Sequence, residues 1–67
     1  MAPYQQRVVD EQAALDDKIV KLLTFLGTSI CHDLDSAEQG RLQRQYKFMQ
    51  GYSEVLAERI AAFVTGD

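Results

Sequence analysis

The chain has 67 residues, of which 46% are hydrophobic, and a net charge of −3. A domain this short buries a modest fraction of its surface and is marginally stable as a monomer. Cys31 is the only cysteine, which excludes an internal disulfide. The excess of acidic residues argues against binding to DNA or RNA polymers, which requires a basic field. The composition therefore favours a small homo-oligomer.

The sequence also lacks membrane and export signals. No apolar run approaches the length that spans a membrane, and the first residues lack the hydrophobic stretch of a signal peptide. We expect a soluble, cytoplasmic protein with no membrane partner.

Apolar residues in the first half of the chain recur with the period of an amphipathic helix. Pro3 can begin this helix, because its missing N–H group is harmless in the first turn. Gly27 is expected to end it in the left-handed conformation that glycine adopts at low cost. We predict a helix over residues 4–26 and a connection over residues 27–35. The stripe consists of Val8, Leu15, Ile19, Leu22 and Leu26.

The second half carries a longer apolar stripe and predicts a helix over residues 36–64. Asp35 is the expected N-cap, with Glu38 three residues later in the position of a capping box. Ser36 with Gln39 is a competing cap. The stripe consists of Leu42, Tyr46, Met49, Tyr52, Leu56, Ile60 and Phe63.

Two amphipathic helices predict an all-α fold in which residues 1–67 form one antiparallel two-helix hairpin. A lone hairpin can cover its apolar stripes only against each other and against copies of itself. We therefore expect a compact homo-oligomer larger than a dimer, with function located between subunits. Gly40 and Gly51 interrupt the second helix at a cost of about 1 kcal/mol each. One interpretation is that the helix tolerates both glycines as imperfections. The alternative, which fits Gly51 better than Gly40, is that another backbone or a flat ligand approaches closely there.

The sequence contains no enzymatic signature. His32 is the only histidine, so no second histidine or cysteine can complete a zinc site with Cys31. No phosphate-binding glycine motif occurs. We expect no catalysis, no metal and no cofactor.

Tyr4 and Lys18 are candidates for ligand binding. Tyr4 lies off the main stripe, where a flat ring can stack on a base. Lys18 follows fourteen residues later on nearly the same face, about 21 Å along one helix at 1.5 Å per residue. One small ligand cannot easily bridge that span within a chain, whereas two copies packed antiparallel can bring the residues together. The alternative is a capping aromatic residue and a solvated lysine.

Three segments give the chain a resemblance to a known family. They are QQRVVDE at residues 5–11, LDDKIVKL at residues 15–22, and YSEVL with ERI at residues 52–56 and 58–60. Together they resemble the helical-hairpin sponges of phages, the second class of anti-CBASS proteins. The similarity extends from Tyr4 to Phe63, and the connection at 27–34 is the part least like the family.

This resemblance implies a homo-oligomer, typically a hexamer, that binds cyclic dinucleotides such as cGAMP and does not cleave them. Some members of the family bind cyclic trinucleotides at a separate site. Sequestration keeps the signal from the effectors of a defence system in the cytoplasm of the infected bacterium. The family's pockets lie between protomers and use a tyrosine near the N-terminus and a lysine of the first helix. Tyr4 and Lys18 match best.

Three further residues belong to the matching segments. Lys21 is the rival of Lys18 for the contact with phosphate, and Arg7 and Arg59 are expected to serve phosphate binding or assembly. The competing hypothesis is a small oligomeric module that binds or inhibits a host protein and has no nucleotide ligand. An enzyme that degrades cyclic nucleotides is a third option, which no constellation of residues supports.

Overall fold

The protein is all-helical over the part of the chain that the structure describes. A computed structural model describes residues 1–65, with only the backbone of Thr65 included. Helix α1 spans Pro3–Leu26, α2 spans Ser29–His32, and α3 spans Ser36–Thr65. The molecule is a rod that measures 47 × 15 × 14 Å. Gly66 and Asp67, which end the expected domain, lie outside the described residues.

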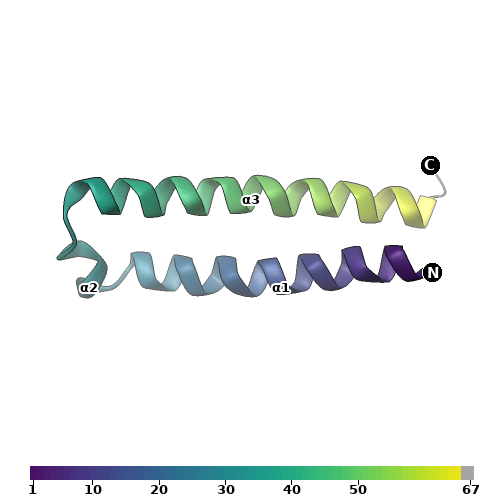
Figure 1. Ribbon diagram of the computed structural model, residues 1–67, viewed down its shortest axis with the longest axis horizontal. Coiled ribbons are helices and arrows are strands. Elements are labelled where there is room, and N and C mark those ends of the chain that lie inside the picture. Colours follow the sequence, from purple (N-terminus) through teal and green to yellow (C-terminus); the bar gives the residue numbers. More distant parts are fainter. Residues whose placement is uncertain (66–67) are drawn as a thin grey trace.

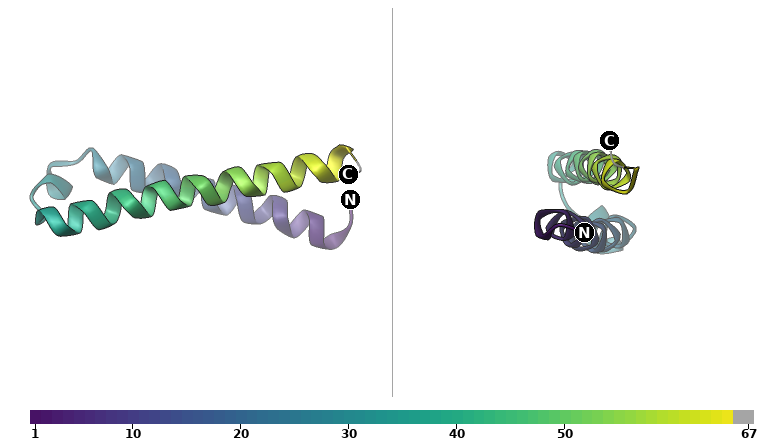
Figure 2. Two further views of the ribbon diagram at one scale, coloured as in Figure 1. Left: turned by 90° about the horizontal axis from the view of Figure 1, so that it is seen from above. Right: turned by 90° about the vertical axis from the view of Figure 1, so that its right-hand side faces the viewer.

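Helices α1 and α3 lie side by side and run in opposite directions, so the start of α1 and the last turns of α3 lie at the same end of the rod (Figures 1 and 2). The core runs along the line where they face each other. Val8 and Leu15 of α1 are buried there against Leu56 of α3, which is 1% exposed. The half-buried side chains that pack around them are Ile19, Met49, Ile60 and Phe63.

Polar contacts fix the register of the two helices near their midpoint. The Gln12 side-chain amide donates to the carbonyl oxygen of Ser53 over 3.2 Å. The Ser53 hydroxyl donates to the Asp16 carboxylate over 2.6 Å. Because two α1 side chains meet the same residue of α3, sliding either helix by one turn would break both bonds.

The start of α1 agrees with the role expected of Pro3, which is its first residue. The Gln5 side chain accepts a hydrogen bond from the Ala2 amide over 2.8 Å and so satisfies a donor at the helix start. Helix α1 ends at Leu26, just before Gly27, as predicted, but the left-handed conformation expected of Gly27 is not observed. Its backbone, at φ −87° and ψ 1°, is not left-handed, because the last turn tightens into i→i+3 bonds: the Gly27 amide donates to Thr24 and the Thr28 amide to Phe25.

The connection contains a short helix, α2, which the sequence did not predict. The Thr28 hydroxyl caps it by accepting from the Cys31 amide over 3.2 Å. The same hydroxyl donates to the Phe25 carbonyl oxygen over 2.7 Å, which ties α2 to the end of α1. Cys31 is a free thiol and only 2% exposed. The description as two helices is therefore incomplete, because a third helical turn closes the end of the hairpin.

Helix α3 begins where Asp35 caps it. The Asp35 carboxylate accepts from the Glu38 amide over 2.7 Å, which confirms the expected N-cap. In a full capping box, the Glu38 side chain would in turn accept from the Asp35 amide. The Glu38 carboxylate instead accepts a hydrogen bond from the Arg41 guanidinium over 2.7 Å. Gln39, offered as a rival cap residue, donates to the Leu34 carbonyl oxygen over 2.7 Å and anchors the connection on α3.

The apolar stripe of α3 is narrower than the sequence indicated. Tyr52, which was placed on it, is 46% exposed and stands outside the core. None of the described helices is long and apolar enough to cross a bilayer.

Candidate functional site

Tyr4 lies in the first turn of α1, at the end of the rod where the chain begins. Its ring stands edge to face against Phe63 of α3, with the centroids 5.8 Å apart and the planes at 82°. Tyr4 remains 52% exposed. Phe63 thus fixes the orientation of the ring and leaves much of it open, as a stacking platform for a base requires.

The two candidate lysines differ in what they contact. Lys21 donates to the Asp17 carboxylate one turn earlier over 2.9 Å, and both side chains are exposed. The hydrogen bond that Lys21 donates to Asp17, together with the negative charge of that carboxylate, raises the pKa of Lys21 above its usual 10.5. Lys18 is exposed and makes no ion pair or hydrogen bond with the described residues. An incoming phosphate therefore meets no competitor at Lys18, whereas at Lys21 it must displace Asp17.

The two candidate arginines are exposed as well. Arg7 lies eleven residues before Lys18, a separation that returns to nearly the same face of α1. Arg59 lies in the second half of α3, after the buried Leu56. Neither forms an ion pair with any of residues 1–65.

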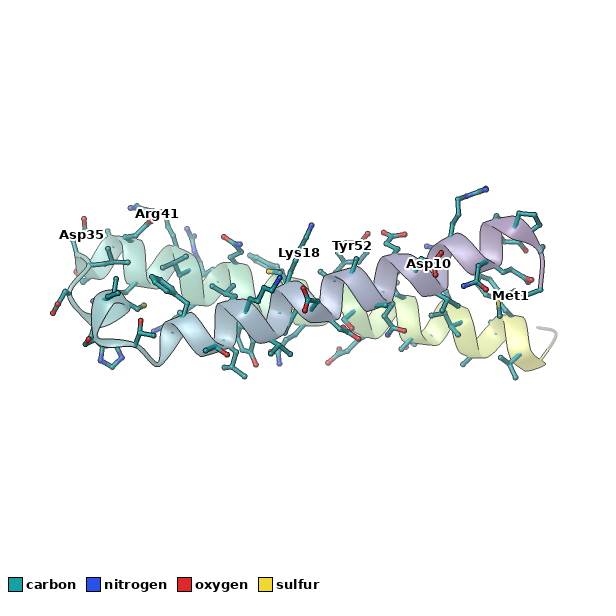
Figure 3. All side chains as sticks on the ribbon, turned by 90° about the horizontal axis from the view of Figure 1, so that it is seen from below. Met1, Asp10, Lys18, Asp35, Arg41 and Tyr52 are labelled. Carbon is teal, nitrogen blue, oxygen red and sulfur yellow. The ribbon has the colours of Figure 1, made fainter. Side chains whose placement is uncertain are left out.

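One hairpin does not bring these candidates together. Tyr4 and Lys18 lie on the uninterrupted helix α1, so about 21 Å separate them at 1.5 Å per residue. Lys18 extends from the middle of the rod, on the long edge that Tyr52 and Arg41 also reach (Figure 3). A pocket that contains both Tyr4 and Lys18 requires a second copy of the chain.

The hairpin does form a hollow on its own, but its chemistry does not suit an anion. This hollow, about 260 Å³, is open to solvent. Asp16 and Glu54 line it from opposite helices, and their negative charges repel a phosphate. None of the five candidate residues contributes to it. The lining residues are Asp16, Ile19, Gln50, Ser53 and Glu54.

The Cys31–His32 pair does not form a metal centre. Cys31 of α2 is buried, while the adjacent His32 is exposed. No group of three histidine, cysteine, aspartate or glutamate side chains among residues 1–65 is placed to hold a metal ion.

Comparison with protein families identifies the family of the chain. The family model described as Sequestin matches residues 2–62, which is nearly the whole chain. The chain belongs to the Sequestin family. The family's name denotes a protein that sequesters, which agrees with a binding role. No curated protein and no solved structure matches this Sequestin-family chain.

Two contributors to the site were missed by reasoning from sequence. Phe63 was assigned to the core alone, yet it also supports Tyr4 from the other helix; only the register of the hairpin reveals that contact. Asp17 forms an ion pair with Lys21, so that Lys21 and Lys18 differ in their freedom to bind a phosphate. Its spacing of four residues from Lys21 is the usual signal of a helical ion pair and could have indicated this difference.

Proposed function

We propose that this protein binds cyclic dinucleotides in pockets between copies of the chain and sequesters them without cleaving them. The observation that carries the proposal is the separation of Tyr4 from Lys18 on one straight helix, with both side chains open to a ligand. Membership in the Sequestin family supports the sequestering role. The ligand class and the role against bacterial defence follow from the resemblance to anti-CBASS sponges.

The pocket forms where two α1 helices pack antiparallel, so that Tyr4 of one copy lies near Lys18 of the other. Such a two-fold contact forms two equivalent pockets, each of which holds Tyr4 of one copy and Lys18 of the other. Stacking contributes roughly 1–3 kcal/mol per base. A charge-assisted hydrogen bond to phosphate contributes about 1.5–3 kcal/mol. In each pocket, stacking on Tyr4 and the contact of Lys18 with phosphate together oppose the entropy lost on binding.

In this proposal the protein acts in the cytoplasm of an infected bacterium. It prevents the cyclic dinucleotide signal from reaching the effectors of the bacterial defence system. A hexamer of hairpins would carry several such pockets. Cyclic trinucleotides are further candidate ligands at a separate site, and Arg59 and Arg7 serve phosphate binding or assembly. Affinity and abundance suffice for this role, and no catalytic group is required.

The test is a thermal-shift panel with cyclic dinucleotides, cyclic trinucleotides and the corresponding linear dinucleotides. We expect stabilisation by a cyclic dinucleotide and recovery of the intact nucleotide after the protein is heated. A module that binds only a host protein would show no shift with any nucleotide. Recovery of a linear product would instead indicate an enzyme.

Mixed oligomers test whether Tyr4 and Lys18 act in trans. Tyr4→Ala and Lys18→Ala chains each retain one half of every pocket. If the residues act in trans, mixing the two variants creates some pockets with both residues and some with neither. A fraction of high-affinity sites should then appear in calorimetry of the mixture. Its absence, with both variants folded and assembled, would contradict the pocket.

A further inference from the structure

Tyr52 of α3 carries an aromatic ring that the hairpin does not use. It stands outside the core, is 46% exposed, and forms no hydrogen bond or ring contact within the described part of the chain. The other two tyrosines do have partners. Tyr4 packs on Phe63, and the Tyr46 hydroxyl accepts a hydrogen bond from Gln50 over 3.0 Å. The Tyr52 ring is therefore free to contact a flat ligand.

Tyr52 lies beside Lys18, although the two residues belong to different helices. The hydrogen bond between Ser53 and Asp16 fixes the register of α3 against α1. Because the helices run in opposite directions, one step forward on α1 and one step back on α3 brings Asp17 level with Tyr52. Lys18 is one residue further, about 1.5 Å along the axis of α1. Both side chains extend to the same long edge of the rod (Figure 3), so they border one stretch of surface.

This edge is separate from the acidic hollow of the hairpin. Lys18 follows Asp16 by two residues, which is about 200° around α1. Tyr52 precedes Glu54 by the same two residues on α3. The hollow, which Asp16 and Glu54 line, therefore opens on the other side of the hairpin. The edge with Lys18 also carries Arg59, which follows Tyr52 by seven residues and so shares its face. An anionic ligand thus meets positive charge beside the Tyr52 ring.

The proposed pocket has one stacking residue for a ligand that has two bases. Each pocket holds Tyr4 of one copy and Lys18 of the other, so the Tyr4 ring accounts for one base only. Tyr52 belongs to the same hairpin as Lys18 and lies beside it, so it enters the same pocket. We infer that Tyr52 stacks on the second base of a cyclic dinucleotide whose phosphate contacts Lys18. This assignment rests on the proposed function and adds the residue that selects for a second base.

A second stacking residue makes the pocket selective for dinucleotides over mononucleotides. A cyclic mononucleotide has one base and can occupy only one of the two rings at a time. A cyclic dinucleotide occupies Tyr4 and Tyr52 together. The second stack strengthens binding by about 5- to 150-fold, which is the stacking energy per base converted to an affinity. The loss of the Tyr52 ring should therefore affect dinucleotides far more than mononucleotides.

Substitutions of Tyr52 test this role by calorimetry with cGAMP and with cyclic AMP. Tyr52→Leu, which stays apolar but loses the ring, should weaken cGAMP binding by about 5- to 150-fold and cyclic AMP binding much less. Tyr52→Phe, which keeps the ring, should retain the affinity that Tyr52→Leu loses. Val55→Ala is the matched control, because Val55 is 52% exposed on the next turn of α3 and has no ring. A loss in Tyr52→Leu that accompanies a lower assembled mass in sedimentation velocity would make Tyr52 structural and overturn the inference.

Tyrosine fluorescence supplies a second readout that keeps every ring in place. The chain has three tyrosines and no tryptophan. A variant with Tyr4→Phe and Tyr46→Phe leaves Tyr52 as the only tyrosine, and a base stacked on it should quench its fluorescence when cGAMP is added. A variant with Tyr4→Phe and Tyr52→Phe leaves Tyr46 as the reference, which should be quenched much less. Equal quenching of the two reporters would overturn stacking on Tyr52.

The same titrations separate this inference from the proposed function. If the wild type binds none of cGAMP, cyclic di-AMP and cyclic di-GMP, the proposed function fails and the role of Tyr52 fails with it. If Tyr4→Ala and Lys18→Ala weaken binding while Tyr52→Leu binds as the wild type does, the proposed function stands and the role of Tyr52 alone is overturned.

Discussion

Tyr4 of α1 and Phe63 of α3 form an edge-to-face aromatic pair with ring centroids 5.8 Å apart. The pair joins the first turn of α1 to the last part of α3, so the orientation of the Tyr4 ring depends on closure of the hairpin at this end. A stacking residue held in this way loses less freedom when a base binds. Phe63 therefore links the packing of the fold to the proposed pocket.

Phe63→Leu should weaken binding of a cyclic dinucleotide by up to about tenfold while the hairpin stays folded. The substitution keeps an apolar side chain but removes the aromatic pair, which is worth about 0.5–1.5 kcal/mol. Phe25→Leu is the matched control, because Phe25 is also half-buried on the hairpin but lies near the opposite end of α1. Calorimetry should find the affinity unchanged in the control. Equal losses of affinity in both variants would mean that Phe63 affects binding only through the stability of the hairpin.

Leu56→Ala should lower the free energy of unfolding by about 2–5 kcal/mol, the range for truncating a buried leucine. Leu56 is 1% exposed and contributes to the core with Val8 and Leu15. Val64→Ala, at a position that is 76% exposed, should change the free energy of unfolding by less than about 0.5 kcal/mol. Urea titration followed by circular dichroism measures both. Leu56→Asp should abolish folding and assembly together, because an unpaired charge is costly to bury.

The helices were predictable because the sequence repeats its apolar residues with the helical period and carries local signals at the starts. The all-helical character is confirmed, and so is the N-cap at Asp35. Both depend on residues that are close in sequence. The end of the first helix at Gly27 is confirmed, but the left-handed backbone expected there was wrong. The i→i+3 bonds of the last turn and the two hydrogen bonds of the Thr28 hydroxyl continue the chain from α1 into α2 instead.

The candidate site was less predictable because it depends on contacts between helices and between copies. Sequence periodicity placed Tyr52 on the apolar stripe, but the crossing of α1 and α3 leaves that ring 46% exposed. The contact between Tyr4 and Phe63 depends on the register fixed by Ser53, which no local pattern encodes. The roles of Tyr4, Lys18, Lys21, Arg7 and Arg59 in ligand binding stay predictions.

Lys18→Ala should weaken nucleotide binding and reduce its dependence on salt, since a screened charge contact is lost. Lys21→Ala should have a smaller effect, because Lys21 is already held by Asp17. Lys21 is protonated across the neutral range, as lysines ordinarily are, and Asp17 raises its pKa further. The contribution of its ion pair to stability is therefore present at neutral pH and is lost only as the pH rises through that raised pKa. Titrations at two salt concentrations compare the variants.

Asp17→Asn is the matched control for the two lysines, because it releases Lys21 without removing a positive charge. Affinity in this variant should be at least that of the wild type. If Lys21→Ala alone abolished binding, the contact with phosphate would move from Lys18 to Lys21, one turn along α1.

Gly40→Ala and Gly51→Ala form a matched pair within α3. Neither added methyl group meets an atom within 4 Å in the single hairpin, so each variant should gain about 0.5–1 kcal/mol of helix stability. Assembly separates the two variants, because Gly51 adjoins the exposed Tyr52, where another backbone or a flat ligand can approach, and Gly40 lies near the start of α3. Gly51→Ala should therefore weaken self-association in sedimentation velocity, even as the isolated chain becomes more helical. Gly40→Ala should raise the melting temperature without changing the mass of the assembly. If both variants assembled as the wild type does, Gly51 would be a tolerated imperfection of the helix.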